Sequence, residues 1–197
     1  SHLYAAIYYF YLMKKVLLFA SGGGSNVKAI LQYFENNSKV SFPAIICNKA
    51  NAGVMEIAKQ YGIDILLIDK ERFQSEIFID TLEYLKPDLL VLAGFLWKIP
   101  NFLIRAFPNK IVNIHPSLLP KYGGKGMYGH FVHEAVVANR ELESGISIHL
   151  VNEQYDEGTI LLQKTVSISP NDSANIVASK VLLLEHEWYS KVIESLL

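Results

Sequence analysis

Short apolar runs alternate with segments of helical periodicity along most of this chain, starting at Lys14. The runs are rich in Val, Ile and Leu without polar alternation, which is typical of parallel strands covered on both faces. Parallel neighbours need crossover connections, and right-handed crossovers through helices build a doubly wound sheet. We therefore predict an α/β fold with a mostly parallel sheet. Its strands are expected at residues 14–20, 42–48, 63–69, 88–95 and 111–115, and its helices at residues 26–34, 54–61, 100–107 and, after residue 69, in one helix that ends at Lys86.

The pattern changes after Gly145. The runs ISIHLV and TILLQKTVSI, separated by the polar turn NEQYDEG, predict a β-hairpin, that is, two strands joined without a helix. The tail from Asn171 predicts one long final helix. Asp172 or Ser173 is its expected N-cap, because short side chains with oxygen atoms accept hydrogen bonds from the first turn. The C-terminal part is thus expected to add antiparallel strands to the parallel sheet.

The first dozen residues, SHLYAAIYYFYL, differ in composition from the rest of the chain. They are apolar and rich in tyrosine, and no basic residue precedes the apolar stretch, so neither a secretory signal nor a membrane span fits. We expect Met13 to be the natural start. We expect residues 1–12 to be a tag or leader without function, and an added edge strand is the alternative. Residues 13–197, in a chain that is 51% hydrophobic, are enough for a single domain with a core.

The charge balance provides no long-range field for a polyanionic partner. The chain has 18 Lys and Arg residues against 19 Asp and Glu residues, so we expect no binding to nucleic acid or to an anionic membrane. Any anionic ligand has to be bound locally. The single cysteine, Cys47, lies in an apolar run and cannot build a disulfide framework. This favours a reducing cytoplasm and a buried, inert thiol.

The stretch NIHPSLLP places an amide and an imidazole on the fifth predicted strand. Asn113 and His115 are two apart, so their side chains project from the same face. In sheets of this kind, ligands bind beyond the carboxyl ends of the strands. The pair is suited to stabilise a developing oxyanion in an acyl transfer. The alternative is that both side chains only satisfy loop backbone.

The stretch SGGGSN, residues 21–26, lies between the first predicted strand and a helix. Glycines let backbone N–H groups approach an anion at the positive N-terminal end of a helix. The stretch is not a dinucleotide fingerprint, because Val27 stands where the third glycine would be, and it lacks the Lys-Ser/Thr pair of a P-loop. We interpret it as a phosphate cradle, and a glycine-rich turn without a ligand is the alternative.

The polar turn NEQYDEG places Asp156 next to the strand that carries His149. A carboxylate near His115 would favour the charged imidazole and orient it as a proton donor, whereas a solvated turn is the alternative for these acids. A metal site of His115, His149 and Asp156 is a further alternative, but the tight spacing of metal ligands is missing and we predict no metal. His130 and His133 are expected on the solvated surface of a helix.

Together these motifs resemble the folate-dependent phosphoribosylglycinamide formyltransferase family of de novo purine synthesis. The resemblance covers residues 14–197. SGGGSN resembles the family's phosphate loop, LAGFLWKIP its folate-contacting segment, NIHPSLLPKYGG its catalytic stretch, and SIHLVNEQYDEG the strand and loop with its catalytic aspartate. The order of the motifs is specific, whereas N-x-H-P-S-L-L-P alone is shared with other formyl-tetrahydrofolate enzymes.

The resemblance implies a Rossmann-like formyltransferase fold and an enzyme of one-carbon metabolism. The implied reaction transfers the formyl group of 10-formyltetrahydrofolate to the amine of glycinamide ribonucleotide. Asn113 would hydrogen-bond the formyl oxygen, His115 would donate a proton and stabilise the oxyanion, and Asp156 would keep His115 protonated. The resemblance further assigns Gly24, Ser25 and Asn26 to the phosphate, Leu96, Trp97, Lys98, Ile99 and Asn113 to the folate, and Glu185 to the neighbourhood of the substrate amine.

The chain departs from the family pattern at two places. Glu76 occupies the position nearest to an arginine that contacts the folate, and KYGGKGMYGHF differs from the common wording of its loop. We expect small-molecule substrates only, a cytoplasmic location, and a monomer or weak homodimer. The alternatives are another 10-formyltetrahydrofolate enzyme, either a deformylase or a formyltransferase for a different amine, and a non-catalytic nucleotide-binding module.

Overall fold

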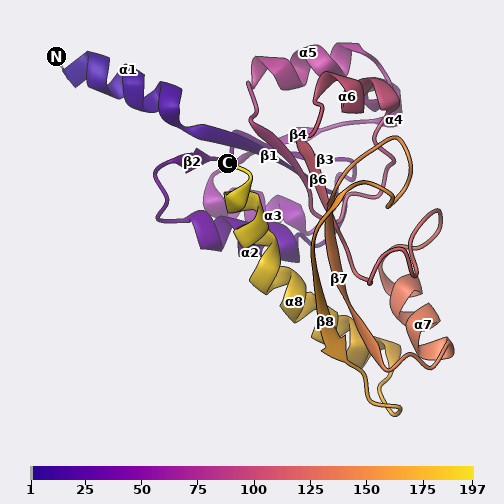
Figure 1. Cartoon of the computed structure of the whole chain (residues 1–197). Helices are drawn as coiled ribbons and strands as arrows, with labels where there is room; N and C mark the ends of the chain where they lie inside the picture. Colours follow the sequence, from indigo (N-terminus) through magenta and orange to yellow (C-terminus); the bar gives the residue numbers. More distant parts are fainter. Residues whose placement is uncertain (1) are drawn as a thin grey trace.

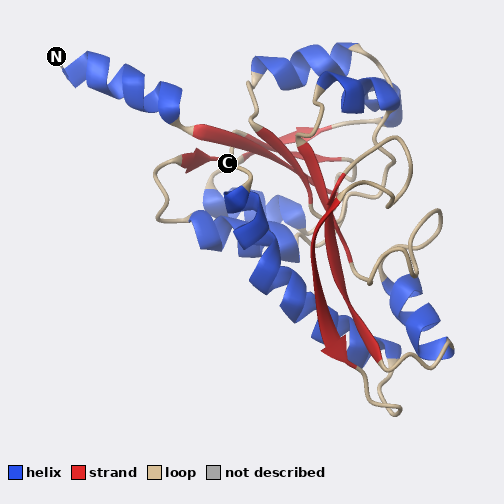
Figure 2. Cartoon of the chain, viewed as in Figure 1, coloured by secondary structure: helices blue, strands red, loops and turns tan. Residues whose placement is uncertain are grey.

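The computed structural model describes residues 2–197, in which one mixed sheet of 8 strands carries the whole fold (Figures 1 and 2). The strand order is β4-β3-β1-β5-β6-β7-β8, and β2 pairs with the start of β1. The strands are β1 (Lys14–Ala20), β2 (Val40–Ser41), β3 (Ala44–Cys47), β4 (Asp64–Leu67), β5 (Leu89–Leu92), β6 (Ile111–His115), β7 (Glu143–Leu150) and β8 (Ile160–Ser167).

The strands from β4 to β6 are parallel to their neighbours, whereas β7 and β8 are antiparallel. This confirms the predicted doubly wound sheet with a C-terminal hairpin. The chain first builds the sheet from β1 outward through β3 and β4, and then returns to the other side of β1 with β5. The strand order therefore reverses between β1 and β5, and ligands of doubly wound sheets bind beyond the carboxyl ends of the strands at such a point.

Helices cover both faces of the sheet. Alternate residues of β1 divide between the two layers: Val16 and Leu18 pack with α2, α3 and α8, whereas Leu17 and Phe19 pack with α4, α5 and α6. This burial on both faces explains why the strands read as continuous apolar runs. The helices are α2 (Ser25–Phe34), α3 (Val54–Tyr61), α4 (Lys70–Phe73), α5 (Ile77–Tyr84), α6 (Asn101–Ala106), α7 (His130–Ala138) and α8 (Ala174–Ser195).

The final helix begins where the sequence pattern predicts. Of the two candidate caps, Ser173 is the one used: its Oγ accepts a hydrogen bond from the N–H of Ile176 at 3.2 Å. Asp172 instead accepts from the N–H of Ser169 at 2.9 Å. The helix then runs along the sheet beside β7 and β8 (Figure 1).

The prediction of one helix ending at Lys86 is wrong, because α4 and α5 are separate helices. Ser75 lies between them, and its Oγ accepts a hydrogen bond from the N–H of Ile77 at 3.3 Å. Local bonds of this kind from Ser compete with the continuous helical ladder. The short strand β2 was not predicted, since two residues are too few to produce a periodic pattern.

Residues 2–12 form a helix, α1 (His2–Leu12), that points away from the sheet (Figure 1). The alternative of an added edge strand is wrong, because β2 already pairs with Lys14 and Lys15 at this end of β1. The proposed lack of function of residues 1–12 stays a prediction, and residue 1 lies outside the described residues. Within residues 2–197, no helix has the length and apolar character needed to cross a membrane.

Candidate active site

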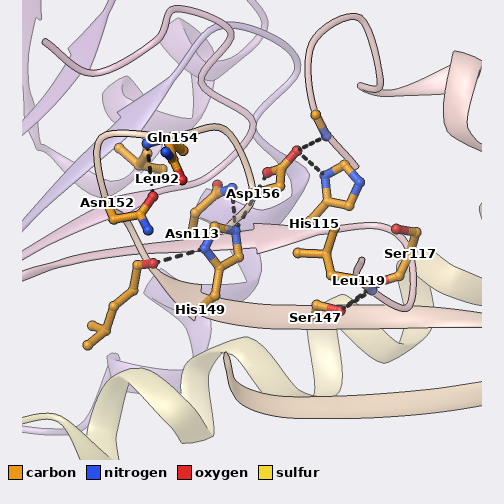
Figure 3. Close-up of polar contacts among 12 residues, drawn as sticks. Leu92, Asn113, His115, Ser117, Leu119, Ser147, His149, Asn152, Gln154 and Asp156 are labelled. Atoms are coloured by element: carbon orange, nitrogen blue, oxygen red, sulfur yellow. Dashed lines mark hydrogen bonds and ion pairs between the residues drawn. The ribbon is translucent and has the colours of Figure 1, made fainter. Parts of the chain in front are cut away.

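Asn113 and His115 lie on β6, and the neighbouring strand β7 places a polar residue opposite each of them. Asn113 pairs with His149 in the register of the two strands, and His115 pairs with Ser147. This register is consistent with the prediction that Asn113 and His115 share one face of the sheet, because their partners, His149 and Ser147, are also two residues apart. Figure 3 shows Asn113, His115 and His149 gathered around Asp156, whereas Ser147 lies beside Leu119 and Ser117.

Asp156 comes from the loop between β7 and β8 and joins the two histidines. Its Oδ2 atom lies 3.6 Å from His115 Nδ1, and its Oδ1 atom lies 3.7 Å from His149 Nε2 (Figure 3). The N–H of Gly124 donates to Oδ2 at 3.0 Å. Asp156 has a φ of 54°, a left-handed conformation that Asp tolerates better than most residues. The structure therefore brings together the three residues predicted for catalysis and adds His149.

The hydrogen bonds of His115 identify its reactive nitrogen. Its Nε2 atom lies 2.7 Å from the carbonyl oxygen of Tyr122, and a carbonyl only accepts, so Nε2 carries a hydrogen. Nδ1 is then the nitrogen that gains or loses a proton, and it faces Asp156. Only 4% of the surface of His115 is exposed, so its ring is held in a buried position at the end of β6.

The amide of Asn113 retains one free N–H. Its Nδ2 atom lies 3.3 Å from His149 Nε2, while His149 Nδ1 lies 3.0 Å from the carbonyl oxygen of Leu150. The Leu150 contact requires a hydrogen on Nδ1, so Nε2 accepts from Asn113 in the tautomer that carries its hydrogen on Nδ1 alone. Because an amide nitrogen has two hydrogens, the second N–H of Asn113 remains available to a ligand.

Burial and charge act in opposite directions on the titrating groups. Burial lowers the pKa of His115, although the charge of Asp156 and the Tyr122 carbonyl act to raise it. Burial alone would raise the pKa of Asp156, but its contacts with His149, His115 and Gly124 together lower it. Asp156 thus favours the charged imidazole as expected, yet burial has the larger effect, and the pKa of His115 is lowered.

Ser147 fixes the turn that follows His115. Its Oγ accepts from the N–H of Leu119 at 2.9 Å and from Nε2 of Gln163 at 2.9 Å, and it donates to the carbonyl of Ser117 at 2.7 Å. Because Ser147 is completely buried, these bonds replace water for the turn's backbone groups. They hold the end of β6, and with it His115, in place.

The predicted phosphate cradle leads directly into α2. Gly24 is the N-cap residue with φ 76°, and no side chain caps this helix end. The uncapped N–H groups and the positive end of the helix dipole suit an anion. Gly24 is also the only residue of the triplet with a positive φ, so it is the one glycine that the turn requires for conformational reasons.

Gly24→Ala is expected to lower the free energy of unfolding by about 1 to 3 kcal/mol. An added Cβ would lie 2.8 Å from Val54 Cγ2 and 2.9 Å from Ile57 Cδ1, in addition to the left-handed strain. Urea unfolding measures the change. Gly22→Ala is the matched control, because its Cβ would meet nothing within 4 Å. Equal stability of the two variants would contradict the role of Gly24.

The predicted folate segment, residues 96–99, is attached to the cradle. The N–H of Leu96 donates to Ser21 Oγ at 2.9 Å, and the N–H of Ser21 donates to the carbonyl of Gly94 at 3.1 Å. Ile99 is buried, whereas Leu96 is 44% exposed. The segment therefore lies at the reversal of strand order with one apolar side chain open to a ligand.

Glu185 lies beside the cradle. Its carboxyl is hydrogen-bonded to the side chain of Asn26, and burial raises its pKa to about 7. The Asn26 Oδ1 atom is buried and has no partner among the described residues. The structure thus joins Glu185 to the phosphate end of the site, although the family resemblance assigns it to the substrate amine.

Glu185→Gln is expected to remove a pH dependence from the stability. The carboxyl ionises near 4.3 in the unfolded chain and near 7 in the folded protein. Ionisation therefore destabilises the fold progressively as the pH rises through this interval, by on the order of 3 kcal/mol. The glutamine variant should gain this stability relative to the wild type at pH 8 and not at pH 5, as measured by urea unfolding.

Glu187→Gln is the matched control for this comparison. Glu187 lies on the same helix with 56% of its side chain exposed, so its replacement should leave the pH dependence as it is in the wild type. Parallel stability curves for wild type and Glu185→Gln between pH 5 and pH 8 would contradict the raised pKa.

In the described part of the chain, His130, His133 and Cys47 form no hydrogen bond or ion pair with the residues of this cluster. His130 is exposed as expected and pairs with Glu134 at 3.0 Å. The prediction of a solvated His133 is wrong: it is 6% exposed, and its Nδ1 atom has no partner among residues 2–197. Cys47 is buried and free, as expected. In the described part of the chain, no group of three His, Cys, Asp or Glu side chains has the arrangement of a metal site.

Residues 14–193 match the model of a protein family described as Formyl transferase. The chain belongs to the formyl transferase family. The matched range includes all strands of the sheet and the whole Asn113–His115–Asp156 cluster. The polar cluster at the end of β6 is thus part of a formyl transferase domain, which confirms the resemblance seen in the sequence motifs.

Named members of this family are similar to most of the chain. The chloroplastic phosphoribosylglycinamide formyltransferase of Vigna unguiculata is 42% identical over 88% of this chain and 57% of the relative. The Bacillus subtilis phosphoribosylglycinamide formyltransferase is 34% identical over 88% of this chain and 90% of the relative. The chain spans little more than half the length of two chloroplastic relatives, 57% and 53%.

Solved formyl transferase structures have the same fold. Glycinamide ribonucleotide transformylase 1 from Geobacillus kaustophilus matches with a TM-score of 0.85 at 29% identity, over 94% of this chain and 99% of that one. Phosphoribosylglycinamide formyltransferase from Bacillus halodurans matches with a TM-score of 0.84 at 31% identity, over 93% and 95%. These matches confirm the predicted fold class.

Ser147 and His149 lie next to the predicted catalytic residues, although the sequence motifs assign Ser147 no role and name His149 only as an alternative metal ligand. Their signal is the same spacing of two that identifies Asn113 and His115. When the antiparallel neighbour of a catalytic strand has polar residues at this spacing, these residues can lie opposite the catalytic pair. The exact register between β6 and β7 is a property of the fold, which is why the motif alone does not reveal them.

Proposed function

We propose that this chain transfers the formyl group of 10-formyltetrahydrofolate to the amine of glycinamide ribonucleotide, the third step of de novo purine synthesis. The observation that carries the proposal is the convergence of Asn113, His115 and Asp156 at the end of β6, with His115 Nδ1 and Asp156 Oδ2 3.6 Å apart. Relatives with this activity in their names support the same chemistry.

Transfer of a formyl group to an amine passes through a tetrahedral intermediate with a negatively charged oxygen. Donors that are fixed in place before the reaction stabilise such an oxyanion. The free N–H of Asn113 and the Nδ1–H of charged His115 are the donors in this proposal. The amine attacks the formyl carbon directly, so no covalent bond to the protein forms, and binding both substrates together fixes their geometry.

Protons move between the two substrates during the reaction. The amine nitrogen loses a proton when its bond to the formyl carbon forms, and the folate nitrogen gains a proton when its bond to that carbon breaks. We assign the transfer to a water molecule bound by Asp156. Because the pKa of Asp156 is lowered, its carboxylate remains ionised at neutral pH and is able to accept hydrogen bonds from this water.

The phosphate of the substrate is proposed to bind at the N-terminus of α2, through backbone groups of Gly24, Ser25 and Asn26. The ends of β1 and β6 are separated by β5, which corresponds to roughly 10 Å. This separation fits a substrate with phosphate and amine at opposite ends of a ribose. Glu185 then faces the ribose phosphate half, and its raised pKa lets it donate a hydrogen bond there.

A single assay tests the proposal. The protein is mixed with glycinamide ribonucleotide and 10-formyltetrahydrofolate, and the appearance of tetrahydrofolate is followed. Product that requires both substrates supports the proposal, whereas formate released without the amine indicates a deformylase. If neither product appears, the remaining candidate function is that of a non-catalytic nucleotide-binding module. The cytoplasmic location and the monomeric or weakly dimeric state stay predictions.

A further inference from the structure

A buried tyrosine of α8 bonds the backbone of two neighbouring strands of the sheet. The Tyr189 hydroxyl lies 2.7 Å from the carbonyl oxygen of Leu92 on β5 and 3.1 Å from the carbonyl oxygen of Val112 on β6. Burial, together with the nearby charge of Glu185, raises the pKa of Tyr189 well above its usual value. The hydroxyl therefore keeps its proton near neutral pH, and the two carbonyls share it as acceptors.

Each of the two carbonyls belongs to a peptide group that leads into a predicted part of the site. Val112 directly precedes Asn113, so its carbonyl shares one rigid peptide plane with the N–H of Asn113. Leu92 ends β5, and the chain continues from it into the folate segment. Leu92 also pairs with Asn113 in the register of β5 and β6. One hydroxyl thus contacts the catalytic strand and the start of the folate segment.

The peptide group after Leu92 is held from both sides. Its carbonyl accepts from Tyr189, and its N–H, which belongs to Ala93, donates to the carbonyl oxygen of Phe19 on β1 at 2.8 Å. In the described sheet, β5 pairs with β6 only as far as Leu92, whereas β6 continues to His115. Tyr189 therefore supplies a hydrogen-bond donor where the parallel ladder beside the catalytic strand ends.

The helix that carries Tyr189 is also joined to the phosphate end of the site. Glu185 lies four residues before Tyr189, on the same face of α8, and its carboxyl is hydrogen-bonded to the side chain of Asn26. Consecutive turns of one helix thus contact the cradle and the backbone of β5 and β6. The position of the Tyr189 hydroxyl is fixed by this packing, so it restricts the two strands that it contacts.

We propose that Tyr189 is a positioning residue of formyl transfer, whose hydroxyl fixes the backbone of Asn113 and thereby aims the Asn113 side-chain N–H at the developing oxyanion. The direction of a strand side chain follows from the backbone that carries it. Oxyanion donors act through geometry that is fixed before the reaction. This inference rests on the proposed function and extends it to a buried residue that reacts with neither substrate.

Tyr189→Phe tests the inference, because phenylalanine keeps the buried ring and removes only the hydroxyl. The turnover number should fall about tenfold, a part of the loss expected when an oxyanion donor is removed completely. The Kd of glycinamide ribonucleotide should remain unchanged. Two backbone carbonyls lose their donor, so some stability is lost as well, and kinetics and binding are measured well below the melting temperature. Unchanged turnover would overturn the inference.

A double-mutant cycle separates positioning from a general loosening of the fold. In the Asn113→Ala background, the amide that Tyr189 positions is absent. Tyr189→Phe should therefore lower the residual turnover by less than about twofold in that background, because the two effects are coupled. A tenfold loss in both backgrounds would show that the effect does not pass through Asn113 and would overturn the inference.

Ser190→Ala is the matched control. Ser190 follows Tyr189 on α8 and is buried, and its Oγ has no hydrogen-bond partner within residues 2–197. This change removes a buried hydroxyl from the same turn without breaking a bond to β5 or β6, so the wild-type turnover should remain. A loss equal to that of Tyr189→Phe would mean that any repacking of α8 has this effect, which would overturn the inference.

Backbone NMR signals give a readout that does not require activity. The amides of Ala93 and Asn113 belong to the two peptide groups that accept from Tyr189, so their signals should shift in Tyr189→Phe, whereas that of Ile45 on β3 should not. Unshifted signals in a protein that transfers formyl groups would overturn the inference alone. Absence of formyl transfer in the wild type would overturn the proposed function, and shifted signals would then still support the contact of Tyr189 with both peptides.

Discussion

Asp156→Asn is expected to lower the turnover number roughly 1,000- to 10,000-fold across the pH range from 6 to 9. The amide has nearly the same shape as the carboxylate, but it has no charge to stabilise the imidazolium form of His115 at 3.6 Å. Without this charge, burial lowers the pKa of His115 further. The amide is also a poorer acceptor for the water that carries the proton. Steady-state kinetics with both substrates measures the change.

The same variant distinguishes a catalytic carboxylate from a structural one. Asparagine keeps an oxygen that is able to accept the Gly124 N–H, which Asp156 binds at 3.0 Å, so the melting temperature should change little. Glu157→Gln is the matched control, because Glu157 is an exposed acid in the same loop. Wild-type turnover combined with a reduced melting temperature would mean that Asp156 only supports the loop.

Local patterns predict those parts of the fold that depend on short-range physics. Apolar runs without alternation indicate strands buried on both faces, and β1 with its side chains divided between two layers is such a strand. The period of two alone is enough to place Asn113 and His115 on one face of their strand. Ser173 as a helix cap follows from the same kind of local rule, since the hydrogen bond spans three residues.

Features that depend on tertiary packing do not appear in the local patterns. His133 looks solvated in the sequence, yet α7 packs against α8 and buries it. His149 becomes part of the site only through the register between β6 and β7. The contact of Glu185 with Asn26 joins the last helix to the first turn of α2. Each of these pairings joins segments that are far apart in the chain.

The site departs from its sequence prediction in electrostatics more than in geometry. A carboxylate beside an imidazole suggests a raised pKa for the imidazole, as expected from the motifs. Burial of His115 has the opposite and larger effect, and burial cannot be judged from the motif alone. The loop residue Tyr122 contributes through its backbone carbonyl, a group that any residue type has, so no sequence signal marks it.

His115→Ala is expected to lower the turnover number about 100- to 1,000-fold, the usual effect of removing one oxyanion donor. Asn113 keeps its free N–H in this variant and accounts for the residual activity. The change removes a buried ring and leaves the Tyr122 carbonyl without its donor, so some loss of stability accompanies it. Binding of each substrate, measured at equilibrium below the melting temperature, separates loss of chemistry from loss of fold.

The pH profile gives a second test of this variant that a purely structural role of His115 would not affect. Burial lowers the pKa of His115 below its usual value near 6.5, so the donating form is lost as the pH rises through that lowered pKa. The substrate amine acts in the opposite direction, because it becomes a nucleophile only when it loses its proton. In His115→Ala the first dependence should disappear, and the residual rate should follow the amine alone. A variant that retains the wild-type profile would show that the proton donor is a different group.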